Sequence, residues 1–154
     1  MLDEGQIAPA FDMPTEQGRI RLSDLRGKLA VVYFYPKDDT SGCTTEARDF
    51  TALYPAFKSA GVEVIGVSPD SVASHCKFAS KHGLSVVLAA DEDKSVAQTY
   101  GVWVEKSMYG RKYMGVERTT FLIDKTGRIA KIWRKVKVPG HAQAVLDTAL
   151  ALSK

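Results

Sequence analysis

The sequence predicts an α/β protein in which helices flank a central mixed β-sheet. Short apolar runs of strand length alternate along the chain with segments of helical periodicity, a pattern typical of α/β folds. Two further apolar runs within 119–133, joined by a tight turn, add antiparallel strands to this pattern. No internal repeat and no Gly/Ser- or Pro-rich linker divides the 154 residues, so we expect one domain over residues 1–154.

The first third of the chain carries the clearest strand and helix signals. Residues 29–35 are an unbroken β-branched and aromatic run, which predicts a strand buried on both faces. A turn-like stretch follows at 36–42, and a helix is expected after it. Pro55 predicts a kink or a break in this helix, and Gly61 is expected to end it. The apolar stripe of the helix consists of Ala47, Phe50, Tyr54 and Phe57.

The middle of the chain repeats the strand-then-helix pattern twice. Residues 62–67 predict a second strand, and the helix-start residues 68–71 lead into a helix that runs to His82. Residues 86–88 predict a short third strand, and 91–100 predict a short helix. A glycine follows each of these two helices, as is common at helix C-termini: Gly83 and Gly101.

The last part of the chain predicts a hairpin and a final helix. The strands of the hairpin are expected at 119–123 and 128–133, and the turn at 124–127 has a glycine suited to positive φ. Pro139 lies near the first turn of an amphipathic C-terminal helix. The apolar positions of that helix are Ala142, Val145, Leu146 and Ala149.

Composition and charge exclude several classes of function. The chain is 45% hydrophobic and 25% charged, with a net charge of +3 and no block of five like charges, which indicates an ordinary solvated surface. The longest apolar run has seven residues, whereas a membrane-spanning helix needs ~20. Residues 1–5 are acidic and do not resemble a secretory signal. We therefore expect no nucleic-acid partner, no membrane partner and a cytoplasmic location.

The two cysteines, Cys43 and Cys76, are too few for a disulfide framework. Cys43 follows the buried strand and opens the first long helix, at the kind of sheet edge where α/β proteins bind ligands. Unpaired N–H groups and the helix dipole favour a thiolate in such a first turn. Polar neighbours at 38–41 and 44–45 argue against an inert buried thiol. The sequence therefore predicts a reactive cysteine.

Several reactions are open to such a thiolate. Thr40 stands where a thioredoxin-type Cys-x-x-Cys motif has its other cysteine, which excludes dithiol exchange within this motif. Its hydroxyl can instead hydrogen-bond a substrate oxygen. Cysteine–histidine hydrolysis is disfavoured because the three histidines lie on predicted helices elsewhere: His75, His82 and His141. A thiol-disulfide oxidoreductase using Cys43 with Cys76, or an interaction protein with an incidental thiol, remains an alternative.

The surroundings of Cys43 resemble a known family. Residues 36–43, Pro-Lys-Asp-Asp-Thr-Ser-Gly-Cys, are similar to the peroxiredoxin signature Pro-x-x-x-Thr-x-x-Cys. Tyr33-Phe34-Tyr35 and Thr44-Thr45-Glu46-Ala47 resemble the bacterioferritin comigratory protein branch, also called peroxiredoxin Q. The likeness covers nearly the whole chain and continues through 66–71, 100–103 and 117–124.

This resemblance implies a thioredoxin-like fold and a thiol-dependent peroxidase that reduces hydrogen peroxide and organic hydroperoxides without a cofactor or metal. It assigns Cys43 as the peroxidatic nucleophile and Thr40 as a hydrogen-bonding partner of the peroxide. It implies that Pro36 shields the pocket from water. Arg118 is expected to stabilise the thiolate and the developing negative charge, and Glu46 to orient Arg118.

The resemblance leaves the resolving thiol open. Many members have it five residues after the nucleophile, where this chain has Arg48, and others at a position matching Ala79. Cys76 lies three residues before Ala79 and shares its helix face. It is the candidate for an intramolecular disulfide with Cys43, which requires local unwinding and is recycled by thioredoxin or a similar dithiol reductant. The alternative is a one-cysteine enzyme with Cys76 a bystander. A monomer or weak homodimer is expected.

Overall fold

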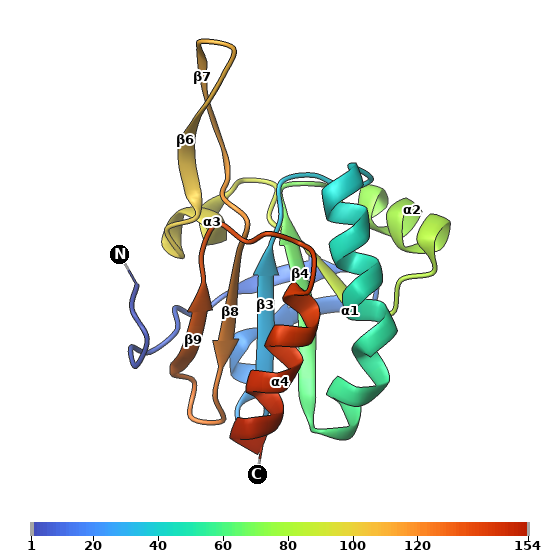
Figure 1. The fold of residues 1–154 in the computed structure, drawn as a ribbon, viewed down its shortest axis with the longest axis vertical. Helices are drawn as coiled ribbons and strands as arrows, with labels where there is room; N and C mark the ends of the chain where they lie inside the picture. Colours follow the sequence, from blue (N-terminus) through green and yellow to red (C-terminus); the bar gives the residue numbers. More distant parts are fainter. Residues whose placement is uncertain (1, 154) are drawn as a thin grey trace.

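The structure is a computed structural model that describes residues 2–153 (Figure 1). Its elements in chain order are β1 (Asp12–Thr15), β2 (Gly18–Arg21), the 3-10 helix η1 (Leu22–Leu25), β3 (Leu29–Phe34), α1 (Ser41–Ser59), β4 (Val62–Ser68), α2 (Val72–His82), β5 (Val87–Ala90), α3 (Ser95–Thr99), β6 (Trp103–Met108), β7 (Arg111–Val116), β8 (Thr119–Ile123), β9 (Ile129–Trp133) and α4 (His141–Ser153). No helix within the described residues combines the length and the apolar character needed to cross a membrane.

Seven strands form one sheet in the order β2-β1-β5-β4-β3-β8-β9. Strands β3, β4 and β5 are parallel, while β1, β2, β8 and β9 join them antiparallel. The expectation of a mixed central sheet flanked by helices is confirmed. The predicted hairpin at the end of the chain is present as β8 and β9.

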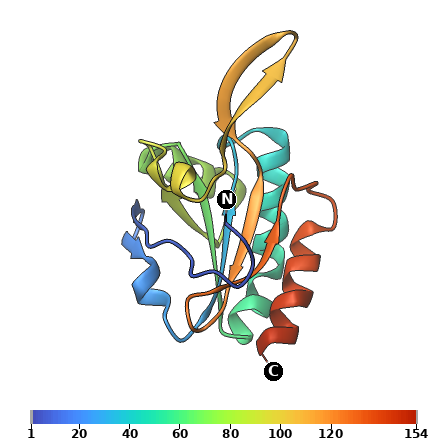
Figure 2. The ribbon, with the colours of Figure 1, turned by 90° about the vertical axis from the view of Figure 1, so that its left-hand side faces the viewer.

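The central strand β3 is buried along its whole length, as its apolar run predicts. Side chains alternate between the two faces of a strand, so β3 contributes to two cores. Leu29, Val31 and Tyr33 pack with α1, α2 and α4 on one face. Ala30, Val32 and Phe34 pack with the N-terminal segment, η1 and α3 on the other. Figures 1 and 2 show the long helices α1 and α4 together on one side of the sheet.

The packing of Tyr33 explains a glycine in the neighbouring strand. Tyr33 pairs with Gly66 of β4 and stacks on Phe50 of α1 with ring centroids 4.6 Å apart. A Cβ atom on Gly66 would lie 2.7 Å from the Tyr33 hydroxyl, closer than atoms can approach. Gly66 therefore gives the buried ring its space and lets α1 lie close to the sheet.

Two helix predictions need correction. The helix predicted over 91–100 is confined to Ser95–Thr99. Lys94 has a φ of +61°, which interrupts the helical pattern, and the Asp91 carboxylate accepts two N–H groups of the first turn of α3. Of the kink or break predicted at Pro55, the break is wrong, because α1 runs unbroken from Ser41 to Ser59 with Pro55 inside it. Gly83 ends α2 in the left-handed conformation, as predicted.

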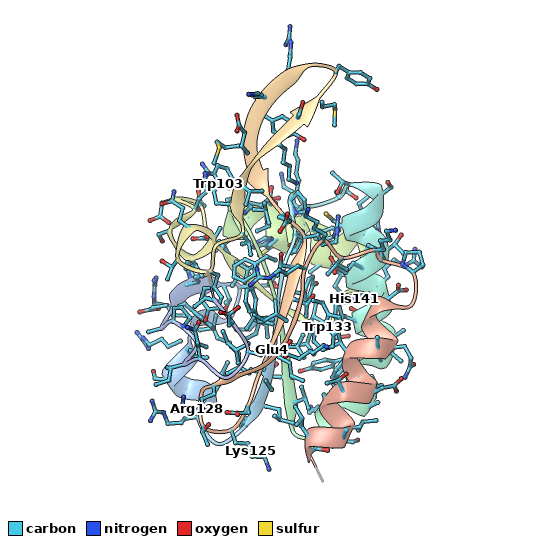
Figure 3. The ribbon with its side chains drawn as sticks, turned by 60° about the vertical axis from the view of Figure 1, so that its left-hand side comes forward. Glu4, Trp103, Lys125, Arg128, Trp133 and His141 are labelled. Carbon is cyan, nitrogen blue, oxygen red and sulfur yellow. The ribbon has the colours of Figure 1, made fainter. Side chains whose placement is uncertain are left out.

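Four strands have no counterpart in the sequence prediction: β1, β2, β6 and β7. Strands β6 and β7 form a separate two-stranded sheet, residues 103–116, which we call the arm. The arm extends well beyond the body of the molecule, from the end at which α1 begins (Figures 1 and 2). Figure 3 shows Trp103 at its root, with Lys125 and Arg128 at the opposite end of the molecule.

Candidate active site

Cys43 lies in the first turn of α1, where the sequence predicts it. The loop 35–40 leaves the carboxyl end of β3, and Thr40 is the N-cap of α1 with extended backbone angles. Its carbonyl accepts the N–H of Thr44 at 2.8 Å, the first hydrogen bond of the helix. The N–H groups around Cys43 therefore belong to the turn in which amides lack helical partners and favour a negative charge. Cys43 is only 1% exposed.

Arg118 joins Cys43 to Glu46, although it lies far from both in the sequence. Its Nη2 donates to the Cys43 Sγ at 3.2 Å and its Nη1 to the Glu46 Oε1 at 2.5 Å. Burial opposes the charge of the guanidinium, but the neighbouring Glu46 and Cys43 outweigh it and raise the pKa of Arg118. A Cβ atom on Gly42 would lie 3.3 Å from Nη2, so the missing side chain leaves room for the guanidinium.

Glu46 is a buried carboxyl group with one free oxygen. It lies three residues after Cys43 and so on the same side of α1. It is 1% exposed, and burial raises its pKa to about 7, against the opposing effect of Arg118. Its Oε2 and the hydroxyl of Tyr33 are both buried without a hydrogen-bond partner among residues 2–153. Because its pKa is about 7, the charge of the Glu46 carboxyl group changes near neutral pH.

Thr40 and Pro36 lie in the loop before α1. The Thr40 hydroxyl donates to the Lys37 carbonyl at 2.9 Å, which leaves its oxygen lone pairs free to accept a hydrogen bond. Thr40 is exposed, and Pro36 is half-buried at the start of the loop. The structure thus brings Cys43, Glu46 and Arg118 into one chain of contacts. Thr40 is three residues before Cys43 in the sequence.

Asp38 fastens the same loop to α2, a feature that sequence reasoning missed. One carboxylate oxygen accepts the Tyr35 hydroxyl at 2.6 Å. The other accepts the Ser74 hydroxyl at 2.7 Å and lies 2.8 Å from Nδ1 of His75. Burial opposes ionisation, but the hydrogen bonds from His75, Tyr35 and Ser74 outweigh it and lower the pKa of Asp38. The loop is therefore held by a buried charge.

Asp39 adds a second, exposed link between the loop and α2. Its carboxylate lies 2.7 Å from Nζ of Lys81 and 2.8 Å from Nε2 of His82. Asp39 has a φ of +61°, which an aspartate tolerates better than most residues. Two adjacent aspartates at the end of a strand were the available signal, but their partners on α2 are more than 30 residues away in the sequence.

Cys76 is partly exposed on α2, and both cysteines are free thiols. Successive residues of an α-helix turn by about 100°, so Cys76 lies about 200° around α2 from Ser74. Since Ser74 and Lys81 contact the loop before Cys43, Cys76 faces away from that loop. The structure does not bring the two thiols together.

The three histidines take part in other contacts, and none is hydrogen-bonded to the Cys43 sulfur within the described part of the chain. His75 and His82 contact the two aspartates, and His141 Nε2 lies 2.8 Å from the Thr120 hydroxyl. Burial, helped by the charge of Arg118, lowers the pKa of His141 to about 4. Figure 3 shows His141 beside Trp133. No group of three or more His, Cys, Asp or Glu side chains in residues 2–153 is arranged to hold a metal ion.

Comparison with known proteins gives consistent matches over almost the whole chain. The profile of the AhpC/TSA family matches residues 5–132. Peroxiredoxin Bcp of Bacillus subtilis is 46% identical over 154 residues, which cover 99% of this chain and 98% of the relative. Peroxiredoxin Bcp of Escherichia coli K12 is 40% identical over 147 residues, 95% of this chain and 94% of the relative. A structure of Xanthomonas campestris peroxiredoxin Q matches with a TM-score of 0.92 at 43% identity, covering 99% of this chain and 100% of that one.

The thioredoxin-like fold and a thiol at a helix N-terminus that accepts a hydrogen bond from an arginine define a thiol peroxidase. The chain belongs to the AhpC/TSA family, in its branch of bacterioferritin comigratory proteins, or peroxiredoxins Q. The fold, family and activity expected from the sequence are confirmed.

Proposed function

We propose that Cys43 is the peroxidatic residue and attacks the hydroperoxide in line with its O–O bond. The thiolate forms an S–O bond as the O–O bond breaks, which leaves Cys43 as a sulfenic acid. The leaving oxygen takes the electron pair and then a proton, and departs as water or an alcohol. The observation that carries this proposal is the 3.2 Å contact from Arg118 to the sulfur, with Arg118 itself held by Glu46.

The groups around Cys43 suit a reaction that moves negative charge from sulfur to oxygen. The fixed donors of the Arg118 guanidinium and the N–H groups of the first turn of α1 remain available to the leaving oxygen. Thr40 is proposed to accept the O–H of the hydroperoxide, because its own O–H is donated to Lys37. Pro36 is proposed to keep water from the pocket. Glu46 is proposed as a positioning residue, which holds the guanidinium in place from its buried side.

We propose Cys76 as the thiol that resolves the sulfenic acid. A disulfide needs Cα atoms within about 7 Å, so the first turn of α1 has to unwind. Since Cys76 faces away from the loop, the contacts of Asp38 and Asp39 with α2 have to open as well. This orientation favours a second candidate, in which an external thiol attacks the Cys43 sulfenic acid directly and Cys76 takes no part.

In either route the electrons come from a thiol reductant, for which we propose thioredoxin or a similar dithiol protein. The enzyme is proposed to work as a single domain over 1–154, as a monomer or weak homodimer. Both cysteines are free in the structure. Free thiols and a thiol reductant are suited to a reducing compartment, so we propose a cytoplasmic location.

Two variants of the reduced protein, and mass spectrometry of the parent, test these assignments. Cys43→Ser is expected to abolish thioredoxin-dependent peroxide reduction, and full activity in this variant contradicts the nucleophile. Cys76→Ser is expected to slow turnover with thioredoxin while the first oxidation of Cys43 stays fast; unchanged turnover makes Cys76 a bystander. Mass spectrometry after one equivalent of peroxide is expected to show a loss of two hydrogens and a Cys43–Cys76 peptide. In the Cys76→Ser variant that peptide is absent.

A further inference from the structure

The arm is a surface feature that the peroxidase reaction itself does not use. Its strands pair from Trp103↔Val116 to Met108↔Arg111, and the turn Tyr109-Gly110 has positive φ at both residues, as a type I′ hairpin requires. A two-stranded hairpin is marginally stable alone in water. The arm projects from the body of the molecule (Figures 1 and 2), and all its strand residues except Val116 are exposed or half-buried.

The arm gathers apolar side chains that are unusual on a protein surface. Seven large hydrophobic residues are exposed in the described chain, and four of them are on the arm. Tyr109 at the tip is 98% exposed and Met108 beside it 56%. The four residues are Met108, Tyr109, Tyr113 and Met114. By the strand register, Met108 and Tyr113 lie on one face of the arm and Met114 on the other. Tyrosine and methionine are enriched in protein interfaces.

The arm is also cationic. Its 14 residues contain three cationic side chains, Lys106, Arg111 and Lys112, against the single carboxylate of Glu105. The excess of two positive charges compares with a net charge of +3 for the whole chain. A partner that fits the arm therefore offers an apolar surface bordered by carboxylates.

The arm joins the body of the protein close to the Cys43 sulfur. Val116, its last residue, is two positions before Arg118, which donates to the Cys43 sulfur. The Lys106 side chain folds over Gly115, where a Cβ atom would lie 3.3 Å from its Cδ. Burial and the charge of Arg118 lower the pKa of Lys106, while Cys43 opposes this effect. A protein held by the arm is therefore held next to the active site.

A second copy of this chain is a poorer occupant. A twofold contact between two arms would place the same cationic side chains against one another, and like charges across an interface are costly. The protein reductant, by contrast, has to approach Cys43 or a disulfide that includes it in every catalytic cycle. We propose that the arm is the docking surface for this reductant, a dithiol protein whose thiols lie in an apolar surface bordered by acidic side chains. This inference rests on the proposed function.

The test compares a protein reductant with a small one. A Met108→Ser, Tyr109→Asn double variant removes the apolar tip, and asparagine tolerates the positive φ of position 109. Lys112→Glu reverses one charge on the arm. Lys125→Glu is the matched control, because Lys125 is also exposed but lies at the opposite end of the molecule (Figure 3). Turnover is measured with bacterial thioredoxin, its reductase and NADPH, and separately with dithiothreitol.

The double variant is expected to raise the KM for thioredoxin about tenfold, a loss of about 1.4 kcal/mol in binding. Lys112→Glu is expected to raise it several-fold, less so at high salt. Lys125→Glu and all dithiothreitol rates are expected to stay at the wild-type level. The proposal is overturned by arm variants with a wild-type KM for thioredoxin, by equal losses with both reductants, or by a change in oligomer mass without a change in KM. Loss of dithiothreitol-supported turnover in the wild type would instead contradict the proposed function.

Discussion

Glu46 is predicted to make the stability of the fold depend on pH, and Glu46→Gln is the variant that tests it. In the folded chain burial raises the pKa of Glu46 from 4.5 to about 7. The folded state therefore binds the proton more tightly than the unfolded state. The stability gained from neutral Glu46 is fully present below pH 4.5 and is lost as the pH rises through 7. A glutamine keeps an oxygen that accepts from Arg118 but cannot ionise.

The size of the effect follows from the pKa difference. Each pKa unit corresponds to 1.36 kcal/mol, so the displacement from 4.5 to about 7 amounts to about 3 kcal/mol in total. About 2.5 kcal/mol of this falls between pH 5 and pH 8. Over that range the free energy of unfolding of the parent chain is expected to fall by about 2.5 kcal/mol relative to Glu46→Gln.

The assay is urea unfolding at pH 5, 6, 7 and 8, with both chains in a Cys43→Ser background so that ionisation of the sulfur does not contribute. Asp24→Asn, which changes an exposed carboxyl group, is the control and should parallel the parent at every pH. Curves for Glu46→Gln that run parallel to the parent within 0.5 kcal/mol, on the order of the error of such measurements, would refute the reasoning.

Three further changes test neighbouring parts of the structure. Arg118→Lys retains the charge but loses the paired donors, so stopped-flow kcat/KM for peroxide should fall about 100-fold; a loss below fivefold contradicts the role of Arg118. Gly42→Ala places a Cβ 3.3 Å from the guanidinium and should slow the same reaction about tenfold without lowering the Tm; unchanged kinetics would show that the guanidinium has room to move. The parent should lose stability as the pH falls from 6.5 toward 4, because the pKa of His141 is lowered to about 4 in the fold, and His141→Gln should lack this loss. Acid unfolding identical to the parent would contradict the buried neutral imidazole.

The sequence alone predicts those helices and strands whose buried side chains form a regular apolar pattern. The run at 29–35 and the stripe through Phe50 and Phe57 predict β3 and α1, because nearly every side chain of β3 and one face of α1 are in the core. The reactive position of Cys43 followed from its place between these two elements. Arg118 and Glu46 needed the family resemblance, since nothing local in the sequence links residues 72 positions apart.

The strands that the sequence did not predict lack a regular pattern of buried apolar residues. Most side chains of β6 and β7 are exposed or half-buried, so no buried face produces an alternation of apolar and polar residues. Strands β1 and β2 have four residues each, and β1 contains Pro14, which disfavours a strand prediction. The contacts of Asp38 and Asp39 depend on how α2 packs, and packing across 36 to 43 residues cannot be inferred from spacing.

The concealment of Cys43 has a consequence for selectivity. Bulky electrophiles and mixed disulfides, which need open surface around a sulfur atom, are screened from the resting enzyme, whereas the slender O–O end of a hydroperoxide needs little room. In the proposed cycle, oxidation and the unwinding that follows turn the same atom outward for a protein thiol. The fold thereby separates the two halves of the cycle by size.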